Sequence, residues 1–179
     1  MSAIDYLKTN LEQRAKNYKK PTLTTIFLLN NYHYILKTVL NSSLNDVVGK
    51  ELEPRYKELI TTMSEDYQAT WKKAIEYLLE VNAGRSAKLA PQKIKEKFKG
   101  FNSEFEDLYK MQQQYSIPDK ELKVKIRRGI IDLIVPLYNK FLERHKDSDF
   151  TKHPEKYIKY DSTQLEKMLN EFFGADVSK

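Results

Sequence analysis

The sequence predicts an all-α fold. Apolar residues recur every three or four positions through three long stretches, the spacing that puts them on one face of a helix. Only five Gly and six Pro are spread over 179 residues, which is typical of long helices and not of a turn-rich sheet protein. The length predicts a single domain with a substantial core. Neighbouring helices joined by short loops run antiparallel, so the sequence predicts helical-hairpin bundles.

The first two helices are expected at residues 3–18 and 22–42, and the third at 51–81. Pro21 can begin the second helix, because a proline in the first turn loses no hydrogen bond. Residues 26–29, Ile-Phe-Leu-Leu, are apolar nearly all round, so this helix is expected to be the most buried. The apolar stripe of the third helix consists of Tyr56, Leu59, Ile60, Met63, Tyr67, Trp71, Ala74, Leu78 and Val81.

The remaining helices are expected at residues 91–114, 119–144 and 162–173. Pro91 is suited to a helix start, and Pro118 with Asp119 opens the next helix. Asp161 can cap the last helix, with Gln164 placed to complete a capping box. No clear domain boundary appears within 1–179, and the loop at 82–90 is the best candidate for a junction between two sub-bundles.

Most catalytic chemistry is missing from the sequence. No cysteine is present, and the three histidines form no metal-binding pattern. His33 is therefore interpreted as a structural histidine and not as a general base. The five glycines form no nucleotide-binding motif, so no cofactor and no enzymatic activity are expected. No apolar run is long enough to cross a bilayer, so any membrane contact is expected to be peripheral.

The net charge of +6 is concentrated in three segments. Residues 85–99 hold six cations against one acid, and residues 119–128 hold five cations against two acids. Most such runs are solvated faces, and the lysines of 93–99 flank an apolar stripe on both sides. Residues 150–160 differ, because their three lysines, Lys152, Lys156 and Lys159, lie on a stretch with no helical stripe to flank.

The lysines of 150–160 favour an anionic membrane surface. A helical turn over 155–160 would direct Lys156 and Lys159 to the same side. Each lysine close to an anionic leaflet contributes about 1 kcal/mol, so three give about 3 kcal/mol, which is too little for stable docking. Binding therefore needs a multiply charged headgroup, such as a phosphoinositide bisphosphate, or several basic clusters on one face.

Three strings in the sequence resemble a known family. They are IFLLNNYHYILK at 26–37, KEKFKGFN at 95–102, with SIPD at 116–119 after it, and FTKHPEKYIKY at 150–160. In order and spacing they resemble the 70-kDa subunit of the exocyst, a vesicle-tethering complex. The chain resembles only the C-terminal part of that family. The resemblance implies the end portion of an elongated rod of stacked helical bundles.

The resemblance also implies a function. Family members tether secretory vesicles to the plasma membrane, and their C-terminal region binds phosphatidylinositol bisphosphate through basic residues. Residues 156–159 read KYIK and match a motif of that region, so Lys156 and Lys159 correspond to its two lysines. Lys152, Arg127 and Arg128 are hypothesised to add supporting charge. The expected location is cytoplasmic, peripheral at the inner face of the plasma membrane where secretion occurs. The resemblance also implies protein partners, namely other exocyst subunits, a Rho-family GTPase and the branched-actin nucleating complex.

Alternative functions stay open. A helical scaffold could use its basic surface to bind an acidic protein, such as a Rho-family GTPase or another exocyst subunit. For such a scaffold, adding phosphoinositide to neutral vesicles would not increase vesicle binding. Nucleic acid is not expected as a partner, because the aromatic residues fall on helical core stripes and are not interleaved with lysines for base stacking.

Overall fold

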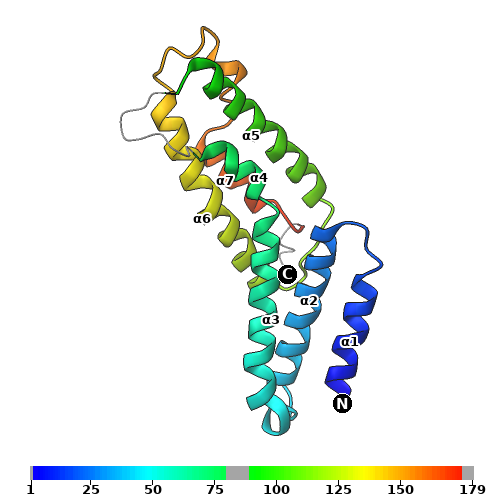
Figure 1. The fold of residues 1–179 in the computed structure, drawn as a ribbon. Coiled ribbons are helices and arrows are strands. Elements are labelled where there is room, and N and C mark those ends of the chain that lie inside the picture. The colour runs from blue at the N-terminus through cyan, green and yellow to red at the C-terminus, as the bar shows by residue number, and fades with distance from the viewer. Residues whose placement is uncertain (1, 80–88, 175–179) are drawn as a thin grey trace. The chain divides into compact units, whose positions relative to one another are not determined.

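A computed structural model describes residues 2–79 and 89–174 of the chain (Figure 1). In these residues all regular secondary structure is helical, as the sequence predicts. The described α-helices are α1 (Ala3–Ala15), α2 (Pro21–Leu40), α3 (Lys50–Ala69), α4 (Lys72–Leu78), α5 (Pro91–Gln112), α6 (Lys120–His145) and α7 (Ser162–Asn170). A π-helical turn, η1 (Asn45–Gly49), precedes α3, and a 3₁₀ turn, η2 (Pro154–Lys156), precedes α7.

The chain forms two compact units. Unit 1 comprises residues 1–70 and 115–123, and unit 2 comprises residues 71–114 and 124–179. The predicted junction at 82–90 lies almost wholly outside the described residues and stays a prediction. The divisions between the two compact units fall at Thr70–Trp71, after Gln114 and within the first turn of α6.

Unit 1 is a helical hairpin with a third helix beside it. Helices α2 and α3 run antiparallel and in contact, and α1 packs against α2 (Figure 1). The Tyr32 ring on α2 meets the Tyr56 ring on α3 edge to face at 5.8 Å. The Tyr32 hydroxyl donates a hydrogen bond to Glu12 on α1, so one buried tyrosine connects all three helices. The buried apolar residues of α2 are Ile26, Leu29, Tyr32, Ile35, Leu36 and Val39.

Unit 2 has an aromatic core. Phe101 of α5 lies 5.0 Å from the ring of Tyr138 on α6, and Phe98 lies 4.9 Å from Phe141. Trp71, which is fully buried, stacks on Phe172 at 5.8 Å between ring centroids. Aromatic pairs of this kind contribute about 0.5–1.5 kcal/mol beyond the area that they bury. The core therefore joins α5, α6, the turn after α7 and Trp71, the residue that precedes α4.

The prediction of one continuous helix over 51–81 is wrong. Helix α3 ends at Ala69 and α4 begins at Lys72. Thr70 closes α3 with its hydroxyl, which donates to the Tyr67 carbonyl at 2.7 Å. The apolar spacing continues across the break because Trp71 is buried in unit 2, so periodicity alone could not reveal the interruption.

The predicted helix starts at the C-terminal end are confirmed. Asp161 accepts from the Gln164 main chain at 2.7 Å, and the Gln164 side chain accepts from the Asp161 main chain at 2.9 Å. This is the expected capping box of α7. Asp119 likewise caps α6, with its carboxylate accepting from the Leu122 main chain at 2.9 Å.

Candidate anion-binding surface

Residues 150–160, here called the lysine loop, carry three exposed lysines. Lys152, Lys156 and Lys159 all project from non-helical backbone or from the short η2 turn. The expected helical turn over 155–160 is wrong, because η2 begins at Pro154 and ends at Lys156. Lys156 and Lys159 therefore do not share a helical face, and their charges are placed by the fold of the loop alone.

Buried side chains hold the lysine loop on unit 2. At its start, Phe150 is buried and stacks on Phe98 of α5 at 5.8 Å. In its middle, the Asn102 amide donates to the Tyr157 carbonyl at 2.8 Å. At its end, the Tyr138 hydroxyl donates to the Tyr160 carbonyl at 2.6 Å. The loop is thus anchored at three levels while its lysines stay in solvent.

Glu106 on α5 neutralises one of the three lysines. The Lys159 ammonium lies 2.8 Å from the Glu106 carboxylate, and this hydrogen bond lowers the pKa of Glu106. The Tyr160 hydroxyl donates to the same carboxylate at 3.0 Å. Burial, and then the bond to Glu106, raise the pKa of Tyr160 to about 12. In contrast, Lys152 and Lys156 have no carboxylate partner among the described residues.

Arg127 is not part of this surface, contrary to the sequence-based hypothesis. Its side chain is 7% exposed, and its guanidinium donates to the main-chain carbonyls of Phe172 and Gly174 at 2.8 and 2.9 Å. The chain between those carbonyls is in the left-handed region, with φ of 65° at Phe173 and 88° at Gly174. Arg127 therefore holds the turn after α7, a structural role that removes it from the headgroup set.

Arg128 is exposed but distant along α6 from the lysine loop. It forms an ion pair with Asp132 at 2.8 Å, so its charge is largely balanced within one helical turn. Tyr138, which contacts the loop, lies ten residues further along α6, about 15 Å at the rise of an α-helix. A supporting role for Arg128 in headgroup binding stays a prediction that the geometry does not favour.

The fold brings to the lysine loop two lysines of α5 that were expected from the sequence only to flank a helix stripe. The ammonium of Lys95 lies 5.9 Å from the centroid of the Tyr157 ring, and that of Lys99 lies 5.4 Å from it. No spacing rule could have paired α5 with Tyr157, because this contact is tertiary. Arg85 and Lys88 of the same cluster lie outside the described residues.

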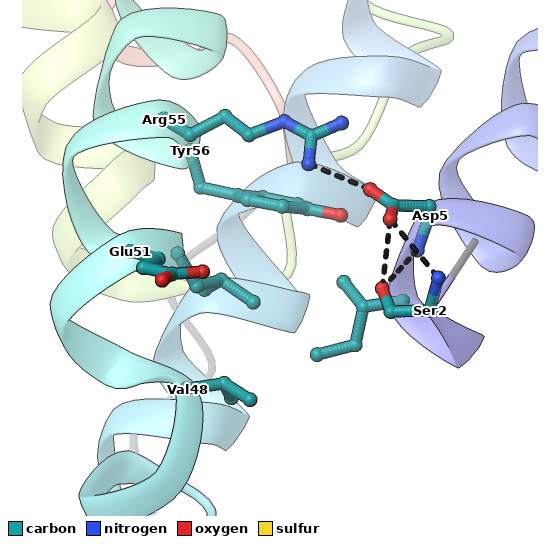
Figure 2. Close-up of a pocket in the computed structure, with 8 residues that line it drawn as sticks. Ser2, Asp5, Val48, Glu51, Arg55 and Tyr56 are labelled. Atoms are coloured by element: carbon teal, nitrogen blue, oxygen red, sulfur yellow. Dashed lines mark hydrogen bonds and ion pairs between the residues drawn. The ribbon is translucent and has the colours of Figure 1, made fainter.

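A cavity of about 340 Å³ lies in unit 1 where α1 and α3 begin (Figure 2). Its Arg55 side chain reaches across to Asp5, with 2.6 Å between nitrogen and oxygen. Hydrogen bonds from Arg55 and Ser2 lower the pKa of Asp5 to about 2. Because the cation of this cavity is already paired with its own carboxylate, the cavity is a poor site for an anionic ligand.

A second cavity, of about 250 Å³, separates α2 from the start of α6 in unit 1. Its charges are likewise paired. Lys37 lies 2.6 Å from Asp119, and the His33 ring nitrogen lies 3.3 Å from the other oxygen of that carboxylate. His33 is thus a boundary residue beside the α6 cap, in agreement with its structural interpretation.

Neither a metal site nor a membrane span is found among the described residues. They hold no group of three His, Asp or Glu side chains that could bind a metal ion. In the same part of the chain, every helix is too short or too polar to reach across a bilayer.

A family model that describes the C-terminal region of Exo70, a component of the exocyst complex, matches residues 1–171. The chain belongs to this family. It is 39% identical to human exocyst complex component 7 over 93% of its length, and 31% identical to the Arabidopsis thaliana component EXO70A1 over 97%. It spans 24% and 29% of the length of those two relatives, so it corresponds to less than a third of each.

Solved structures agree with this assignment. Exo70 of S. cerevisiae matches 88% of the chain with a TM-score of 0.73 at 30% identity, and the chain covers 29% of that protein. A second structure, of Exo70p described together with the C-terminal domains of Exo84p, matches 87% with a TM-score of 0.72. The resemblance to the 70-kDa exocyst subunit and the all-helical fold are both confirmed.

Proposed function

We propose that this chain is a non-enzymatic membrane-docking region of an exocyst subunit, which binds phosphatidylinositol bisphosphate through the lysine loop. In this function it tethers secretory vesicles at the inner face of the plasma membrane. Membership of the Exo70 family supports the exocyst role, with other exocyst subunits as partners. The lysine loop supports the lipid role.

The observation that carries the proposal is the unbalanced charge of an anchored loop. Lys152 and Lys156 are exposed and have no carboxylate partner among the described residues, whereas Arg55 and Lys37, in the two unit 1 cavities described above, are paired with Asp5 and Asp119. The anchors at Phe150, Asn102 and Tyr138 fix the loop before it meets a ligand. A preorganised site loses less entropy on binding, so a given number of contacts yields a higher affinity.

The headgroup contacts are assigned to Lys156 and Lys159, with Lys152 as added charge. Lys159 must exchange Glu106 for a phosphate to take part. A phosphate monoester carries close to two charges near neutral pH, against one for the carboxylate, so the exchange is electrostatically favourable. A leaflet of singly charged lipids offers no such gain, and the site should therefore prefer a multiply phosphorylated headgroup.

Vesicle co-sedimentation tests the proposal. The chain is mixed with neutral vesicles, with and without phosphatidylinositol bisphosphate, at near-physiological salt. Replacing Lys156 and Lys159 by alanine should weaken lipid-dependent pelleting about 30-fold, at about 1 kcal/mol for each lysine. The matched control replaces Lys16 and Lys19, two exposed lysines with the same spacing in unit 1, and should bind as the parent does.

Two outcomes contradict the lipid function. If the parent chain does not pellet, a scaffold for an acidic protein, such as a Rho-family GTPase, the branched-actin nucleating complex or another exocyst subunit, becomes the better account. If the control pair loses binding as the loop pair does, net charge and not the lysine loop governs adsorption. Circular dichroism of each variant separates loss of binding from loss of fold.

A further inference from the structure

Tyr157 is the point where α5 and the lysine loop meet. The ammonium groups of Lys95 and Lys99 both lie within 6 Å of its ring centroid. An aromatic ring attracts cations through its quadrupole, which explains why two lysines gather here. The ring carries no net charge, however, so it holds the two ammonium groups without neutralising them.

The α5 lysine pair, Lys95 and Lys99, is unlike the neighbouring lysines of unit 2. Lys93 pairs with Glu96, Lys73 with Glu104 and Lys159 with Glu106. Lys97 donates to the main-chain carbonyls of Tyr77 and Leu79 at 3.0 and 2.6 Å. Within residues 2–79 and 89–174, no carboxylate lies within ion-pair distance of Lys95 or Lys99.

Two like charges one helical turn apart repel each other, so the α5 lysine pair is unfavourable in the unbound chain. An anion placed between the two ammonium groups would relieve that repulsion. Lys156 adjoins Tyr157 in the chain, and Asn102 fixes the Tyr157 carbonyl to α5. The unpaired charges of α5 and of the loop are therefore held around the same residue.

We propose that Lys95 and Lys99 belong to the same polyphosphate-binding surface as Lys156 and Lys159, with Tyr157 at its centre. The ligand class is an inositol ring that bears two or more phosphate monoesters, supplied by a lipid headgroup. This inference rests on the proposed function. It adds two residues from α5 and makes the surface depend on the tertiary contact between α5 and the loop.

The test removes the two charges while keeping a polar side chain at each position. Lys95→Gln with Lys99→Gln should weaken pelleting with phosphatidylinositol bisphosphate vesicles about 30-fold, which corresponds to about 2 kcal/mol. Lys95→Arg with Lys99→Arg keeps both charges and should retain binding within about threefold. The matched control is Lys16→Gln with Lys20→Gln, an exposed unit 1 pair of the same spacing, which should bind as the parent does.

A second arm identifies the source of the phosphates. Soluble inositol trisphosphate should compete the parent chain off the vesicles, and vesicles with matched charge from phosphatidylserine should bind it more weakly. Equal binding to both vesicle types would overturn the polyphosphate site in favour of simple adsorption.

The outcomes separate this inference from the function beneath it. If the α5 glutamine variant binds normally while the Lys156 and Lys159 variant does not, the α5 pair is outside the site and the docking function stands. If the arginine variant loses binding as the glutamine variant does, the two lysine side chains contribute through packing on the Tyr157 ring. That result would overturn the assignment of their charges to the ligand. If phosphatidylinositol bisphosphate does not increase pelleting of the parent chain, both proposals are wrong.

Discussion

Two cationic regions of unit 2 use the same kind of charge in opposite ways. Arg127 is buried and donates hydrogen bonds to main-chain carbonyls in the turn after α7. Lys156 is exposed and has no acceptor among the described residues. A buried cation must find its hydrogen-bond acceptors inside the protein because desolvation is costly, whereas an exposed cation is solvated by water until a ligand binds. Burial therefore decides which cations hold the fold and which can bind a ligand.

The largest expected effect comes from Arg127. Arg127→Ala removes charged donors from the Phe172 and Gly174 carbonyls, which surround a left-handed Phe173. We expect the free energy of unfolding to fall by about 2–4 kcal/mol, since hydrogen bonds to charged groups contribute about 1.5–3 kcal/mol. Urea titration followed by circular dichroism measures the change.

Arg128→Ala is the matched control on the same helix. Its ion pair with Asp132 is exposed, so the stability should change by less than about 1 kcal/mol. Equal losses for the two variants would contradict the distinction between a buried and an exposed arginine.

A smaller effect is expected at the anchor of the lysine loop. Asn102→Ala removes the amide that donates to the Tyr157 carbonyl, and Asn102 is 3% exposed. We expect a loss of about 1–2 kcal/mol in unfolding free energy and weaker lipid binding, because the loop is no longer fixed to α5. Thermal denaturation and co-sedimentation measure the two effects.

Gln92→Ala on the same helix provides the comparison, since the Gln92 amide is exposed and donates to Glu96, its one side-chain partner among the described residues. It should leave both quantities unchanged. Unaltered lipid binding in a destabilised Asn102 variant would argue that loop order does not matter to the site.

The smallest effect is an increase in affinity. Glu106→Gln frees Lys159 while leaving the amide oxygen to accept from Tyr160. Binding to phosphoinositide vesicles should tighten by about two- to fivefold, since an exposed ion pair contributes about 0.2–1 kcal/mol. Glu104→Gln adds the same net charge but frees Lys73 of α4 instead, and should change binding less. A larger gain from Glu104→Gln would place the binding surface nearer α4.

The sequence predicted local features of this fold better than tertiary ones. Helix starts at Pro21, Pro91 and Asp161 follow from main-chain geometry and capping, and all three are confirmed. The break at Thr70 was missed because Trp71 keeps the apolar spacing across it. Arg127 was misassigned because its acceptors lie 45 residues away, where no pattern within α6 could point to them. The contact of the α5 lysine pair with Tyr157 was missed for the same physical reason.

The position of Trp71 has an optical consequence. It is the only tryptophan of the chain, it is fully buried, and it belongs to unit 2. Its ring packs on Phe105 and Phe172, so its emission reports the packing of unit 2, where the lysine loop is anchored. Far-ultraviolet circular dichroism, in contrast, sums the helices of both units. The chain thus carries an intrinsic fluorescent probe within the unit that holds the proposed docking surface.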